Sequence, residues 1–88
     1  MAEYRLTPAA AGDIREIGEF TNRVWGAIQR KYYLSELAES LDRVARHPEL
    51  GRNRDDIQPG LKCVAFQRHL IFYNAGSDGV EIVRVLHG

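Results

Sequence analysis

Apolar residues recur at helical spacing in the first part of the chain. Ile14, Ile17 and Val24, together with Thr21, stand three or four positions apart. The charged residues Asp13, Glu16, Glu19 and Arg23 take the other sides, which is typical of an amphipathic helix over about residues 8–24. Thr7 offers a hydroxyl that can cap the first turn, and Pro8 suits the first helical position because it has no N–H to satisfy.

A second apolar stripe follows Gly26 and predicts a helix over about residues 27–46. Its members are Ile28, Tyr32, Leu34, Leu37, Leu41 and Val44. His47-Pro48 ends this helix, because a residue that precedes proline avoids the helical region. The connection between the two helices is very short, so we expect them to pack antiparallel as a helical hairpin.

The spacing of apolar residues changes after residues 48–60, which are polar, rich in turn-forming residues and predicted to be a loop. Three runs rich in β-branched and aromatic residues follow, at residues 61–66, 69–74 and 80–87. Gln67-Arg68 separates the first two runs, and a segment containing Asp78-Gly79 separates the last two. These runs predict two successive hairpins.

A further short strand is expected at Glu3–Leu6. The predicted order is β-α-α-β-β-β, an α+β fold in which the helical hairpin packs on one face of a small antiparallel sheet. The side chains expected in the core are Ile14, Ile17, Val24, Ile28, Leu37, Leu41, Val44, Leu70, Phe72 and Ile82.

Both faces of the predicted sheet carry apolar side chains. Strict alternation in the last strand puts Ile82, Arg84 and Leu86 on one face. The same alternation puts Val83, Val85 and His87 on the other face. Because the helical hairpin covers only one face, the second is either open and apolar, which is typical of a partner surface, or covered by something else.

Composition limits the classes of function. The 88 residues form one domain, 1–88, with 12 basic and 12 acidic side chains. This balance argues against a protein that coats nucleic acid, although a local basic patch remains open. The lone Cys63 has no partner for a disulfide, and no metal-ligand spacing or cofactor motif is present. Without a leader or a membrane-length apolar run, the expected location is the cytoplasm, with no membrane contact.

The polar residues of the strands raise the question of catalysis. Cleavage of RNA needs a base, an acid and a cation that converge on one phosphate. On a regular strand Arg84 and His87 face opposite ways, so they cannot reach one phosphate unless a bulge intervenes. His69 and Tyr73 lie roughly 13 Å apart along their strand. We therefore predict no catalytic residues and interpret these side chains as scaffold or interface.

Four segments together resemble the ParE toxins of the RelE/ParE toxin–antitoxin superfamily, and the β-α-α-β-β-β order agrees with that fold. These segments are YRLTPAAAGDIREI at 4–17, HPELGRNRDD at 47–56, PGLKCVAFQRHLIFY at 59–73 and VEIVRVLHG at 80–88.

The resemblance implies a toxin of a type II module, with a ParD-like antitoxin as its partner in a hetero-oligomer and DNA gyrase as its target. DNA is then contacted only through the antitoxin or the gyrase complex. RelE relatives instead cut messenger RNA on the ribosome, and this alternative stays open, as does an inactive relative that only binds an antitoxin. The residues expected to bind antitoxin or target are Trp25, Lys62, Arg68, His69, Tyr73, Arg84 and His87.

Overall fold

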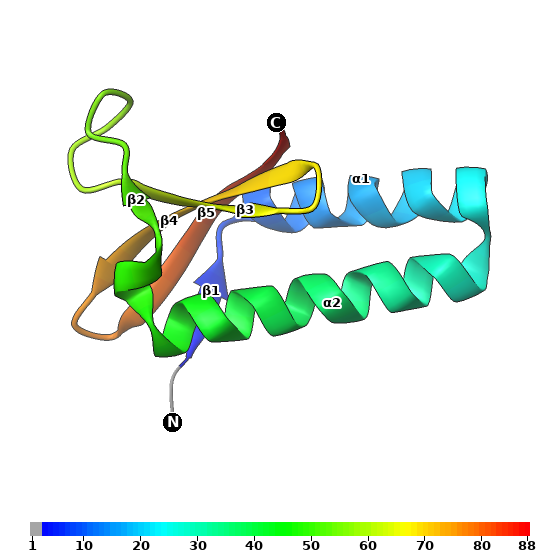
Figure 1. The fold of residues 1–88 in the computed structure, drawn as a ribbon, viewed down its shortest axis with the longest axis horizontal. Helices are drawn as coiled ribbons and strands as arrows, with labels where there is room; N and C mark the ends of the chain where they lie inside the picture. Colours follow the sequence, from blue (N-terminus) through cyan, green and yellow to red (C-terminus); the bar gives the residue numbers. More distant parts are fainter. Residues whose placement is uncertain (1–2) are drawn as a thin grey trace.

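The computed structural model describes residues 3–88, in which two helices pack on one face of a five-stranded sheet (Figure 1). The predicted α+β class and the order of the main elements are confirmed. In chain order the elements are β1 (Tyr4–Leu6), α1 (Pro8–Trp25), α2 (Ala27–Arg46), a 3-10 turn (Pro48–Leu50), β2 (Arg52–Asn53), β3 (Lys62–Phe66), β4 (His69–Gly76) and β5 (Gly79–His87). No helix within residues 3–88 has the length and apolar character needed to cross a membrane.

Local chemistry sets the limits of the helical hairpin as predicted. The Thr7 hydroxyl accepts a hydrogen bond of 3.0 Å from the Ala10 amide and so caps α1. Gly26 separates α1 from α2 with φ at 95°, a backbone conformation that glycine adopts without steric cost. The two helices therefore reverse direction at a single residue and pack side by side.

The sheet is mixed, with strand order β1-β5-β4-β3-β2. The predicted antiparallel hairpins β3–β4 and β4–β5 are present. β1 instead pairs parallel with β5, because the helical hairpin carries the chain back across the sheet before β5 is formed. β2 and the 3-10 turn lie inside the segment that was predicted to be loop, and β2 pairs with only two residues of β3.

A β-bulge at Val83 changes which side chains of β5 face the helices. Phe72 pairs with Arg84 and Tyr73 pairs with Ile82, which leaves Val83 as an extra residue. Val85 therefore joins Ile82 in the core beneath the helices. The predicted alternation, which put these two residues on opposite faces, is wrong beyond Ile82 because it assumed a regular strand.

Two apolar clusters result, one on each face of the sheet. The larger lies under the helices and contains Ala10, Ile17, Leu37, Leu41, Val44, Ile71, Tyr73, Val80, Ile82 and Val85. The smaller, on the second face, contains Leu61, Cys63 and Phe72, with Leu70 and Val83 packed against it. The Arg54 guanidinium lies 6.0 Å from the centroid of the Phe72 ring. The chain's own loop thus contributes cover to the second face.

The far end of the helical hairpin extends beyond the sheet (Figure 1). Val24 is 49% exposed and Ile28 is 88% exposed, so their predicted place in the core is wrong. The other predicted core residues are buried, except Ile14 and Leu70, which are partly buried and pack against the clusters. We call the exposed apolar group at this end the overhang; it consists of Phe20, Val24, Trp25, Ile28 and Tyr32.

Candidate functional site: a groove between the helical hairpin and the end of the sheet

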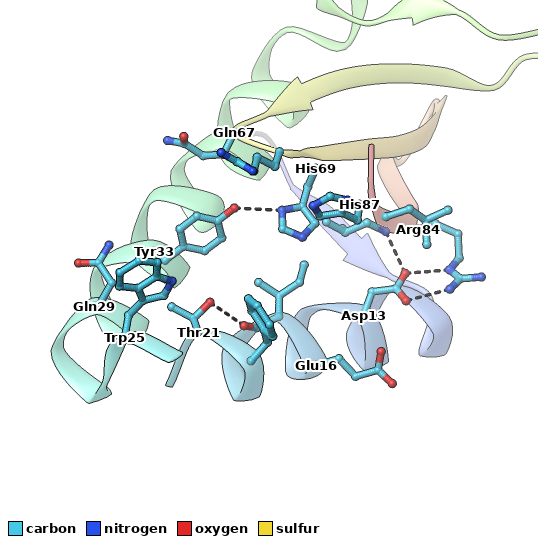
Figure 2. A pocket seen from close by; sticks show the side chains of 15 residues that line it. Asp13, Glu16, Thr21, Trp25, Gln29, Tyr33, Gln67, His69, Arg84 and His87 are labelled. Carbon is cyan, nitrogen blue, oxygen red and sulfur yellow. Dashed lines mark hydrogen bonds and ion pairs between the residues drawn. The ribbon is translucent and has the colours of Figure 1, made fainter. Parts of the chain in front are cut away.

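A groove of about 590 Å³ lies between the helical hairpin and the end of the β4–β5 ladder (Figure 2). Helix α1 contributes acidic and apolar side chains, and α2 contributes Gln29 and Tyr33. The turn between β3 and β4 contributes Gln67 and Arg68, the first residue of β4 contributes His69, and the end of β5 supplies the rest of the wall. Phe20 and Trp25 belong both to this groove and to the overhang, so the two surfaces are continuous.

Two histidines from neighbouring strands face each other in the groove. His69 and His87 are direct partners in the β4–β5 ladder. Their ring centroids lie 5.5 Å apart with the ring planes at 85°. The bulge at Val83 is the reason that His87 shares the helix-facing side of the sheet with Val85 and His69.

Tyr33 orients His69 from the helical side. The Tyr33 hydroxyl lies 3.0 Å from Nδ1 of His69, and its ring packs edge-on to Phe66 at 5.3 Å between centroids. Burial lowers the pKa of His69, and the nearby His87 acts in the same direction. Burial also raises the pKa of Tyr33, with a smaller contribution from Glu36. Burial and the nearby His87 thus both favour the neutral form of the His69 imidazole.

A partly buried ion pair holds α1 against the free edge of β5. The Asp13 carboxylate accepts two hydrogen bonds of 2.8 Å from the Arg84 guanidinium and one of 3.0 Å from the Val85 amide. The Arg84 hydrogen bond is the main reason that the pKa of Asp13 lies below its usual value, against the opposing effect of burial. The carboxylate replaces the neighbouring strand that β5 lacks beyond Ile82, where its pairing with β1 ends.

Five of the seven residues expected to bind a partner line this groove: Trp25, Arg68, His69, Arg84 and His87. Arg84 and His87 do face opposite ways along β5, but Arg84 lies at the sheet edge and reaches around it to Asp13. The two residues therefore line one groove although no bulge lies between them. Edge strands allow a long side chain to reach either face.

The other two expected residues lie elsewhere. Tyr73 is fully buried, and its hydroxyl donates to the Pro48 carbonyl at 2.6 Å and accepts from the Gly51 amide at 2.8 Å. It anchors the segment after α2 and presents no surface to a partner. Lys62 pairs with Tyr73 at the end of β3 away from the groove, since the opposite end of β3 pairs with His69.

Two residues that position the site were not identified from the sequence. Asp13 was assigned to the solvent side of α1, although it stands four residues before Ile17 and so shares the buried stripe. That spacing was the available signal. Tyr33 follows Tyr32 in the sequence, and only Tyr32 matches the apolar stripe, so periodicity pointed to the exposed residue of the pair.

The arrangement is suited to binding. Two polar groups of the groove are already paired within the chain. The Thr21 hydroxyl donates to the Ile17 carbonyl at 2.7 Å, and the Arg84 guanidinium is held by Asp13. Apolar surface at one end of the groove and Arg68 and the histidines at the other would accept a segment with apolar and acidic side chains.

The sequence matches one protein family over almost its whole length. Residues 4–88 match the family model described as the ParE toxin of the type II toxin–antitoxin system, parDE. Toxin ParE1 of Mycobacterium tuberculosis is 39% identical over 87 residues, which cover 98% of this chain and 89% of that protein.

Solved structures share the fold. A chain of the chromosomal ParDE system from P. aeruginosa aligns with a TM-score of 0.83 at 16% identity, covering 99% of this chain and 96% of that one. A chain of the YoeB–YefM complex from Staphylococcus aureus aligns with a TM-score of 0.62 at 13% identity, covering 100% and 98%. These likenesses concern the fold, whereas the family follows from the sequence: the chain belongs to the ParE toxins of type II toxin–antitoxin systems.

Proposed function

We propose that this protein inhibits DNA gyrase by binding to it, without chemistry of its own, and that a ParD-like antitoxin neutralises it. The observation that carries the proposal is the match to the ParE family along residues 4–88. The groove and the overhang support it, because they form one continuous exposed surface with the mixed character of a protein interface.

The overhang is the proposed centre of the antitoxin interface. Trp25 is 70% exposed and Ile28 is 88% exposed, although neighbouring positions on the same helices pack against the sheet. Large aromatic and aliphatic side chains of this kind contribute most of the energy in many interfaces. An apolar antitoxin segment would cover them, and its acidic side chains would lie near Arg68.

A matched pair of variants tests the antitoxin surface. Ile28→Glu puts a charge in the overhang, whereas Ile57→Glu puts the same charge on an exposed isoleucine in the loop between β2 and β3. We expect Ile28→Glu to weaken antitoxin binding by at least about tenfold, since a buried unpaired charge costs several kcal/mol. Ile57→Glu should bind as the wild type does. Calorimetric titration with antitoxin measures the affinity of wild type and of both variants. Equal affinities for all three proteins would show that the overhang is not part of the antitoxin interface.

Purified gyrase tests the target. We expect the chain to inhibit supercoiling and to increase gyrase-dependent DNA cleavage, and we expect added antitoxin to reverse both effects. A known gyrase poison serves as the positive control. If a folded chain that binds antitoxin leaves gyrase unaffected, gyrase is not the target.

A second candidate is a ribosome-dependent endoribonuclease, favoured by one observation. His69, His87, Arg68 and Arg84 all line one groove, although the sequence alone predicted no convergence. An acid, a base and a cation are what RNA cleavage requires. Primer extension on ribosome-bound message distinguishes the candidates: new 5′ ends that appear only with the chain and vanish with antitoxin would favour the nuclease.

A further inference from the structure

The two histidines of the groove form a cross-strand pair of a particular kind. The Gly88 amide donates to the Arg68 carbonyl at 2.8 Å, so the neighbouring pair in the ladder is hydrogen-bonded. Antiparallel ladders alternate between hydrogen-bonded and non-hydrogen-bonded pairs, and side chains approach most closely in the latter. His69 and His87 therefore occupy a non-hydrogen-bonded pair, where two rings on one face can reach a common point.

The ring separation matches that of two imidazoles on one metal ion. Zinc–nitrogen bonds of about 2.0–2.1 Å and tetrahedral angles place two ligating rings roughly 5–6 Å apart between centroids. The His69 and His87 centroids are 5.5 Å apart. The rings lie in the groove rather than under the helices, so an ion from solvent can reach them.

Tyr33 supplies the outer hydrogen bond that metal-bound histidines usually have. When Nδ1 of His69 carries the ring proton, it donates to the Tyr33 hydroxyl oxygen at 3.0 Å, and Nε2 keeps its lone pair for a metal. Tyr33 thus acts as a positioning residue.

We propose that His69 and His87 together bind one divalent transition-metal ion of the class of Zn²⁺, Ni²⁺ or Cu²⁺. Imidazole nitrogen suits these ions, whereas Mg²⁺ and Ca²⁺ prefer oxygen ligands. Residues 3–88 contain no cluster of three or more metal-binding side chains. Water or a group from outside the chain therefore fills the remaining positions, and the site is open to an incoming ligand.

The chain contains a matched control for this site. Its third histidine, His47, lies at the end of α2, 3.8 Å from a Glu49 carboxylate oxygen and outside the groove. Zn²⁺ affinity is measured by calorimetry or by competition with a chromophoric chelator, using the full chain without an affinity tag. We expect one ion per chain, with binding at least about tenfold weaker in His87→Gln and in His69→Gln.

His47→Gln and Cys63→Ser should bind Zn²⁺ as the wild type does, and Tyr33→Phe should weaken binding up to about tenfold. Addition of Ni²⁺ or Cu²⁺ should broaden the ring proton signals of His69 and His87 but not those of His47. His87 is exposed, so its replacement leaves the core intact and keeps the test decisive. Equal Zn²⁺ affinity in wild type and His87→Gln, or no binding at millimolar Zn²⁺, would overturn the proposal.

Discussion

The two ends of the helical hairpin carry the same apolar periodicity but have different surroundings. At the sheet end, Ile17, Leu37 and Leu41 are buried against β4 and β5. At the overhang, Val24 and Ile28 continue the same stripes and remain exposed. A stripe at helical spacing reports which face of a helix is apolar, but not whether the chain itself supplies the surface that covers it.

The two ends of the hairpin therefore differ in whether their apolar side chains contribute to stability or are available for recognition. Burial at the sheet end contributes to folding, whereas the apolar surface of the overhang stays in water until something binds it. Three matched pairs of substitutions, each comparing a side chain that is packed within the fold with an exposed side chain of the helices, can break or sharpen this comparison.

The largest contrast is expected between Leu41→Ala and Ile28→Ala. Leu41 is 3% exposed, so its truncation leaves a cavity and should lower the free energy of unfolding by about 2–4 kcal/mol. Ile28 has almost no packing to lose, and its truncation should change stability by less than about 0.5 kcal/mol. Chemical denaturation measures both. Comparable losses would mean that the overhang is packed in solution.

The next contrast is Asp13→Asn against Glu19→Gln, two neutralised carboxylates on α1. Asp13 accepts three hydrogen bonds, so Asp13→Asn should lower the free energy of unfolding by about 2 kcal/mol. Glu19 is exposed, so Glu19→Gln should leave the free energy of unfolding almost unchanged. Because folding lowers the pKa of Asp13, its contribution is complete above the unfolded value of 3.8 and is lost as pH falls through the lower folded value. The difference in unfolding free energy between wild type and Asp13→Asn should therefore become smaller in acid. A difference that does not depend on pH contradicts this account.

The smallest contrast is Tyr73→Phe against Tyr32→Phe. Removal of the Tyr73 hydroxyl leaves the Gly51 amide and the Pro48 carbonyl without their partner and should cost about 1–2 kcal/mol. The exposed Tyr32 should tolerate the change. Thermal unfolding monitored by circular dichroism compares the two, and an unchanged Tyr73→Phe would show that water replaces the lost hydrogen bonds.

Sequence patterns predicted the elements well because local signals mark their ends. Thr7, Gly26 and Pro48 limit the helices, and Asp78-Gly79 marks the last hairpin. The parallel place of β1 and the two-residue β2 depend on pairing between distant segments, which no local pattern records.

The site was predictable only in part. Arg68, His69 and Arg84 were selected by residue type, but their convergence depends on the bulge at Val83 and on the edge position of β5. Neither feature follows from alternation. Asp13 appeared to be an ordinary surface carboxylate, because its partner Arg84 lies 71 positions away in the chain.

Amide hydrogen exchange on the chain, alone and with antitoxin, tests the central claim that the overhang is a binding surface. Few buried contacts hold the helices there, so amides of residues 20–32 should exchange faster in the free chain than those of residues 37–45. Antitoxin should slow exchange mainly at residues 20–32 and at the groove residues 67–69 and 84–87. Protection confined to the loop at 54–60, with the overhang unchanged, would contradict the account.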